Sequence, residues 1–120
     1  TVPIIKAYAG MGIGDGIISL LAPEKIDGVV IEALGAGNLP PLAAREIKSL
    51  MDKGVPVVLV SRCFNGIAEP VYAYEGGGVK LQEAGVMFVK ELNAPKARLK
   101  LLIALSAGLE GQELKDYIEG

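Results

Sequence analysis

The sequence GVVIEAL at residues 28–34 runs directly into GAGNLPP at residues 35–41. A short apolar run rich in β-branched residues is typical of a strand buried on both faces of a parallel sheet. The glycines that follow permit a tight turn, and the two prolines end strand pairing and favour the start of a helix. In open α/β sheets, ligands bind at the carboxyl ends of the strands. Asn38 is therefore a candidate ligand-contacting residue, with an ordinary strand-to-helix turn as the alternative.

The composition predicts a single domain with an aliphatic core. The chain has 120 residues, of which 51% are hydrophobic and only 5% aromatic. Its 16 glycines suit the turns of an α/β fold better than a helix bundle. The net charge of −2 and the scattered Lys and Arg residues argue against a nucleic-acid partner. The apolar runs are too short to span a bilayer, so we expect no membrane partner.

Apolar runs alternate with helical patterns along the chain, which predicts a doubly covered parallel sheet. The expected strands cover residues 3–8, 28–34, 55–61 and 86–89. The expected helices cover residues 17–25, 42–53, 80–84, 94–107 and 112–118, the third being a short helix or turn. We therefore predict one domain over residues 1–120. Its fold class is α/β, a three-layer α/β/α (Rossmann-like) domain with a small, mainly four-stranded parallel sheet.

Two of the expected helices have clear faces. In the helix at 42–53, the apolar stripe consists of Leu42, Ile47, Leu50 and Met51, and Gly54 ends the helix. The helix at 94–107 has Asn93 as its N-cap and Pro95 in its first turn. In that helix, Leu99, Leu102 and Ile103 are expected to share one face. Lys96, Arg98 and Lys100 are expected to form a solvated face.

The chain lacks the residues of several common catalytic sites. It contains no histidine, which excludes a Ser-His-Asp triad, a Cys-His dyad and a His-ligated metal within these residues. Its single cysteine, Cys63, is expected to be a quiet thiol, although Arg62 beside it could lower its pKa. A single thiol also hints at a reducing compartment. Because the chain begins with Thr1 rather than Met, we expect a fragment or a processed chain.

Two glycine-bearing loops are further candidates. The loop at residues 10–16 reads G-x-G-x-G-x-G, which does not match the G-x-G-x-x-G dinucleotide motif and favours a simple turn. The loop at 62–78 carries Tyr72, Tyr74 and Glu75 just before three glycines. Tyrosines at a loop rim are typical of a contact surface, and an ordinary packed loop is the alternative.

Three segments in order carry a family resemblance. They are GAGN at 35–38 with Pro40, PVVLVSRC at 56–63 with Gly66, and NAPKARLKLL at 93–102. Together they resemble the C-terminal domain of the bacterial-type L-asparaginases, over essentially all 120 residues. This resemblance implies an amidohydrolase that converts L-asparagine to L-aspartate and ammonia, and from the single thiol we expect a cytoplasmic location. It implies neither a cofactor nor a metal ion.

The resemblance also implies how this domain takes part in the reaction. In the family, a separate N-terminal domain carries the nucleophilic threonine, and none of its motifs occurs here, so Thr1 is not that nucleophile. The C-terminal domain assembles into a homodimer or homotetramer and completes the substrate site of the neighbouring subunit. Asn38 matches the family's GxGN asparagine near the substrate's amino group, and Tyr72 or Glu75 matches a second contact.

Some family members also bind asparagine at an effector site, which would lie near Ser61 and Cys63 here. Glu32 stands where those members have an arginine, a departure that argues against effector binding. Two other functions stay open on the sequence alone. One is an amino-acid-sensing module without catalysis, which would use the polar edge at Asn38 and Arg62. The other is a nucleotide-binding module that depends on the loop at 10–16.

Overall fold

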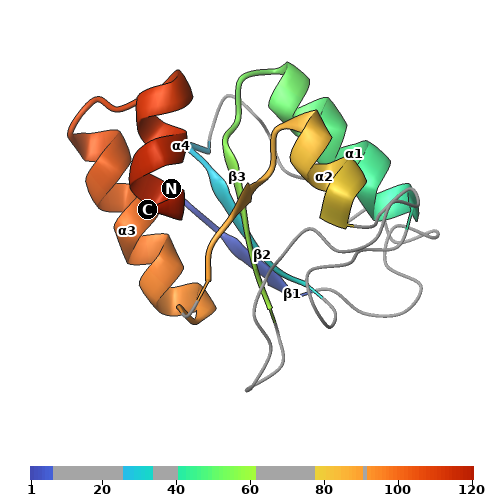
Figure 1. Ribbon diagram of the computed structural model, residues 1–120, viewed down its shortest axis with the longest axis horizontal. Helices are drawn as coiled ribbons and strands as arrows, with labels where there is room; N and C mark the ends of the chain where they lie inside the picture. The colour runs from blue at the N-terminus through green and yellow to red at the C-terminus, as the bar shows by residue number, and fades with distance from the viewer. Residues whose placement is uncertain (7–25, 34–40, 62–77, 91) are drawn as a thin grey trace.

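The computed structural model describes residues 1–6, 26–33, 41–61, 78–90 and 92–120. Its elements are β1 (Ile4–Lys6), β2 (Val29–Ala33), α1 (Pro41–Asp52), β3 (Val57–Ser61), α2 (Gly78–Ala84), β4 (Met87–Phe88), α3 (Ala94–Ser106) and α4 (Gly111–Glu119). Figure 1 shows α1 and α2 on one side of the sheet and α3 and α4 on the other. The predicted three-layer α/β/α fold is therefore confirmed. The helix expected at 17–25 lies outside the described residues.

The four strands form one parallel sheet in the order β1-β2-β3-β4, as predicted. Val30 in β2 pairs with Ile4 on one side and with Val58 on the other. Parallel neighbours need a crossover between them, and α1 supplies it between β2 and β3. All strands end at the same edge of the sheet, here called the carboxyl edge, and begin at the opposite amino edge. Of the helices in the described part of the chain, none is long and apolar enough to cross a membrane.

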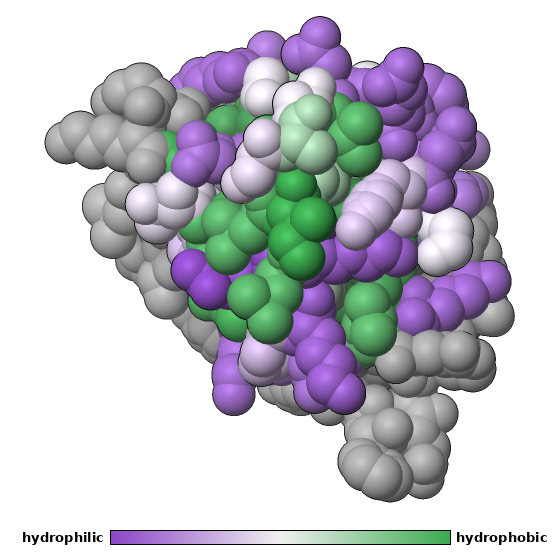
Figure 2. Space-filling view, turned by 90° about the vertical axis from the view of Figure 1, so that its left-hand side faces the viewer, coloured by the Kyte–Doolittle hydropathy of each residue, from purple (hydrophilic) through white to green (hydrophobic). Residues whose placement is uncertain are grey.

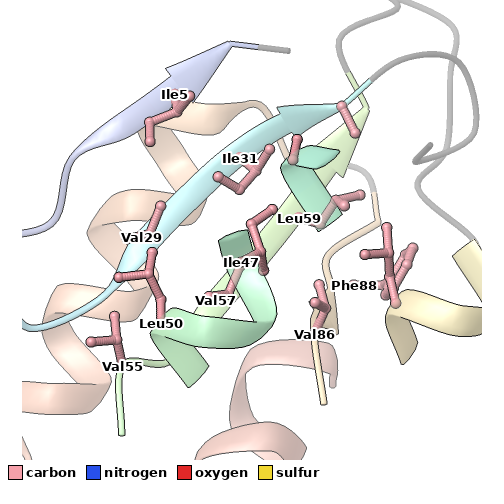
Figure 3. Close-up of a cluster of buried hydrophobic side chains, with 13 residues drawn as sticks. Ile5, Val29, Ile31, Ile47, Leu50, Val55, Val57, Leu59, Val86 and Phe88 are labelled. Carbon is pink, nitrogen blue, oxygen red and sulfur yellow. The ribbon is translucent and has the colours of Figure 1, made fainter. Parts of the chain in front are cut away.

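Alternation of side chains along the strands gives the domain two hydrophobic cores. Figure 3 shows the first core, in which Val29 and Ile31 of β2 face Ile47 of α1. The second core lies on the other face, where Val30 of β2 packs with Leu101 of α3. Each of these five side chains is 0% exposed. Because both faces of β2 and β3 are covered, these strands read as continuous apolar runs rather than alternating ones.

Helix α1 follows its predicted amphipathic pattern. Ile47 and Leu50 are buried in the first core, and Met51 packs partly buried against it. Burial of one such side chain stabilises the fold by about 1.5–3 kcal/mol. The helix ends at Asp52, and Gly54 adopts a positive φ of 88° in the turn that leads into β3. That backbone conformation favours glycine, as expected for the residue that ends this helix.

Helix α3 begins as predicted. The Asn93 side-chain oxygen accepts a hydrogen bond from the backbone N–H of Lys96 at 2.9 Å, which caps the first turn. The face that packs on the sheet consists mostly of small residues, and they allow a close approach. The buried residues of α3 are Ala94, Ala97, Leu101 and Ala104. A Cβ atom on Gly28 would lie only 2.8 Å from Leu101 Cδ2, so this glycine makes room for the leucine.

The apolar face expected for α3 is not its buried face. Leu99 is 56% exposed and Ile103 is 60% exposed, whereas Leu102 is partly buried. The alanines on the opposite side of the helix fit the narrow space above the sheet, and the larger side chains therefore point away from it. The apolar pattern thus indicated a helix correctly but did not identify the side that packs on the sheet.

Two of the three cations expected to be solvated have structural contacts. Arg98 Nε donates a hydrogen bond to the carbonyl of Val2 at 2.7 Å. Arg98 is partly buried and Val2 is buried. Lys100 Nζ donates to the carbonyls of Ile118 and Gly120 at 3.1 and 3.2 Å. An ammonium group at the end of α4 also interacts favourably with the helix dipole. Only Lys96 is as exposed as the sequence predicted.

The open side of β4 is covered by a side chain from α4. Glu119 Oε2 accepts a hydrogen bond from the backbone N–H of Phe88 at 2.8 Å. Its other carboxylate oxygen, Oε1, lies 2.6 Å from Lys115 Nζ, one helical turn earlier. An edge strand otherwise presents free N–H groups to solvent and to other chains. The Glu119 carboxylate therefore satisfies a donor that the sheet leaves unpaired.

The two faces of α3 can be compared by the same substitution at two leucines. Leu101→Ala removes a fully buried side chain, and we expect it to lower the free energy of unfolding by about 2–5 kcal/mol. Leu99→Ala removes an exposed one, and we expect a change within about 0.5 kcal/mol. Urea unfolding at low protein concentration, followed by circular dichroism, measures both. Equal losses at the two positions would show that the burial pattern of α3 is wrong.

The contact between Glu119 and β4 predicts a graded response. Glu119→Ala leaves the Phe88 N–H without its acceptor and should lower the free energy of unfolding by about 1–3 kcal/mol. Glu119→Gln keeps a carbonyl acceptor at the same position and should cost less. Amide hydrogen exchange at Phe88 should become faster in the alanine variant than in the glutamine variant. The same exchange rate in both variants and the unmodified chain would contradict this contact.

Candidate functional site

The carboxyl edge of the sheet is where the sequence predicted a ligand site. Ala33 ends β2 and Ser61 ends β3, and these two residues are register partners in the parallel ladder. Neighbouring strands lie about 4.8 Å apart. The chain segments that follow the two strands therefore leave the sheet from adjacent points. This convergence is what an open α/β sheet provides for ligand binding.

The predicted site residues belong to these two segments. Asn38 lies between Ala33 and the start of α1, and Tyr72 and Glu75 lie between Ser61 and the start of α2. All three lie outside the described residues, as do Arg62 and Cys63. The described structure therefore shows only where the strands before them end, and the roles of these residues stay predictions.

Glu32 and Lys6 are the charged residues that the described strands bring to this edge. They are register partners in β1 and β2, and Lys6 Nζ lies 3.9 Å from Glu32 Oε2. The Glu32 side chain is 17% exposed and the Lys6 side chain is 76% exposed. A contact of this length, whose lysine lies largely in solvent, contributes little to stability. The pair places a carboxylate where the sequence comparison with effector-binding family members expected an arginine.

The described residues do not form a recognisable catalytic set by themselves. The chain has no histidine. Within the described ranges, no group of three or more His, Cys, Asp or Glu side chains is placed to hold a metal ion. The predicted alternatives at Cys63 and in the loop at 10–16 lie outside these ranges.

A groove of about 790 Å³ lies at the opposite, amino edge of the sheet. Its apolar lining includes Leu105 in the last turn of α3, Leu109 just after that helix and Met87 of β4. Asp27 and Glu110 add carboxylates. Sequence reasoning gave no signal for this groove, because its lining comes from segments far apart in the chain. The described residues that line it form no combination of groups that points to a reaction.

Comparison with known proteins agrees with the observed fold and identifies the family. Residues 1–118 match the glutaminase/asparaginase C-terminal domain family. A probable L-asparaginase from Deinococcus radiodurans is 46% identical over 114 residues, which are 95% of this chain and 34% of that protein. The chain thus spans about a third of the length of the relatives it matches.

Solved structures give the same result. The crystal structure of L-asparaginase I from Vibrio cholerae superposes with a TM-score of 0.80 at 27% identity, over 99% of this chain and 35% of that one. A probable cytoplasmic L-asparaginase from Campylobacter jejuni gives a TM-score of 0.74 at 25% identity, over 98% of this chain and 34% of that one. The family expected from the three sequence segments is confirmed: this chain belongs to the glutaminase/asparaginase C-terminal domain family.

Proposed function

We propose that this chain is the C-terminal domain of a cytoplasmic enzyme that hydrolyses L-asparagine to L-aspartate and ammonia. The observation that carries the proposal is the family match over residues 1–118, combined with relatives about three times as long. The chain, whose domain boundaries are residues 1–120, contributes substrate contacts rather than the nucleophile, and it is inactive alone. The name of the Campylobacter jejuni structure supports the compartment.

Asn38 is the substrate contact for which the fold gives most support. The segment that carries it leaves the sheet at Ala33, beside the end of β3, from which the segment carrying Tyr72 and Glu75 departs. A free amino acid presents an ammonium group, and carboxamide, phenol and carboxylate oxygens accept its hydrogen bonds. Asn38 with Tyr72 or Glu75 would therefore hold the amino group of asparagine. The chemistry on the side-chain amide then belongs to the N-terminal domain.

The direction of the chain favours completion of this site by another subunit. The Thr1 carbonyl accepts a hydrogen bond from the backbone N–H of Asp27 at 2.8 Å, just before β2 begins. A domain joined upstream of Thr1 would therefore arrive at the amino edge. The carboxyl edge lies about 16 Å away along the five residues of β2. The catalytic domain of a neighbouring subunit can approach that edge directly, which is consistent with a homodimer or homotetramer.

The proposal assigns the nucleophile to the N-terminal domain and substrate contacts to this chain, and it therefore predicts which part is active. We expect no ammonia release from L-asparagine by this chain alone, because the nucleophile is outside it. Addition of the separately produced N-terminal domain should restore release, since the two halves then complete the site. A coupled ammonia assay on each half and on the mixture measures this. Release by the chain alone would contradict the proposal.

Asn38 can be tested in the full-length enzyme. Asn38→Ala should lower kcat/KM at least about tenfold, equal to about 1.4 kcal/mol of transition-state binding, through a higher KM, a lower kcat or both. Gln112→Ala is the matched control, because it removes an exposed carboxamide on α4. The Gln112 side chain donates a hydrogen bond to Asp116 on the same helix. Steady-state kinetics measures both variants. An unchanged kcat/KM in Asn38→Ala would remove this residue from the substrate site.

A further inference from the structure

The outer face of α3 and α4 carries large apolar side chains in solvent. Among the described residues, Leu99, Ile103 and Tyr117 are the large hydrophobic side chains that remain exposed, at 56%, 60% and 37%. Leu99 and Ile103 are four residues apart on α3 and therefore lie on the same side of the helix. Figure 2 shows hydrophobic surface gathered near the centre of the face that α3 and α4 form, with hydrophilic surface around it.

Leu99, Ile103 and Tyr117 belong to neither of the two hydrophobic cores that the described residues form. The opposite side of α3 already packs on the sheet through Leu101 and three alanines. Tyr117 lies next to Lys100 of α3, with the ammonium nitrogen 5.4 Å from the centre of its ring. The exposed tyrosine and the two exposed aliphatic side chains thus sit on adjoining helices. Clustered apolar residues within a polar rim are typical of a protein–protein contact.

The charges around the apolar centre are self-complementary. Lys96 and Lys100 share the side of α3 that carries Leu99 and Ile103, and this helix has no acidic residue. On α4, the acidic residues Glu113 and Asp116 are exposed, whereas the Glu119 carboxylate is already occupied by the backbone N–H of Phe88 and by Lys115. A two-fold axis that runs between the two helices would bring α3 of one copy opposite α4 of the other. Opposite charges then meet on both sides of the axis, as an isologous interface requires.

We propose that the outer face of α3 and α4 is the surface on which two copies of this chain pair. The inference rests on the oligomeric enzyme proposed above and goes further by naming the surface. Leu99, Ile103 and Tyr117 form its apolar centre, and the opposed charges of the two helices fix its orientation. The surface covers a helical layer and leaves the carboxyl edge of the sheet open. Pairing of two copies and substrate binding therefore use different parts of the domain.

Sedimentation velocity of this chain, over a wide range of protein concentration, tests the surface. The unmodified chain should form dimers, and higher salt should weaken them because opposed charges contribute. Leu99→Glu and Ile103→Glu should each weaken dimer formation at least tenfold, since each places a carboxylate in the apolar centre. Gln82→Glu is the control, because it adds the same negative charge at an exposed position on α2, in the other helical layer. Circular dichroism checks that all variants are folded.

The outcomes separate this surface from the proposed function. Dimers that survive both Leu99→Glu and Ile103→Glu would show that two copies pair elsewhere, which overturns the surface while the oligomeric enzyme stands. A chain that stays monomeric at every concentration would also overturn pairing through this face. In that case, a loss of thermal stability on Leu99→Glu in the full-length protein would assign the face to the N-terminal domain. Ammonia release by the full-length protein tests the proposed function independently of all three results.

Discussion

The parallel pairing of β2 with β3 is the constraint on which the rest of the domain depends. Five residues of each strand are in register, from Val29 with Val57 to Ala33 with Ser61. A parallel ladder forces each connection to return across a face of the sheet, and the apolar side chains on both faces then need helices above and below. The two cores, the three layers and the two distinct edges all follow from this pairing. The carboxyl edge is a consequence of the same geometry, because both strands end there together.

The sequence predicted the strands and helices that this pairing requires. It did not predict which face of α3 packs on the sheet. The strand runs and the Ile47–Leu50 stripe of α1 were identified because burial on a sheet leaves a periodic pattern. In α3 the same reasoning selected Leu99, Leu102 and Ile103, because a leucine-rich stripe is the usual sign of a core face. The sheet surface below α3 accepts alanines instead, and Gly28 leaves space for one leucine. The preference for alanine depends on the distance between α3 and the sheet. The sequence of the helix alone does not give this distance.

Polar side chains were the other limit of sequence reasoning. Arg98 and Lys100 look like solvated cations in the sequence, yet their partners are backbone carbonyls of Val2, Ile118 and Gly120. Glu119 looks like a surface acid at a helix end, yet it covers a donor of β4 that is 31 residues away. Such contacts depend on where the chain ends and loops come together in space. For the candidate site, the sequence placed Asn38 after a buried strand. The structure shows that this strand ends at Ala33 beside Ser61 of β3, and the position of Asn38 itself stays a prediction.

The two edges of the sheet and the outer face of α3 and α4 lie in separate parts of the domain. This separation bears on how a multidomain enzyme of this kind can be built. In the proposed enzyme, the upstream domain would join at the amino edge and the substrate would lie at the carboxyl edge, with the α3–α4 layer beside both. Evolution can therefore alter Leu99 or Ile103 without moving the strand ends, and can lengthen the segments after β2 and β3 without changing the apolar face. Substrate contacts on long segments tolerate such variation because the paired strands fix their starting points. The outer face of α3, in contrast, exposes Leu99 and Ile103 without adding them to either core, and the proposed pairing of two copies would remove both side chains from water.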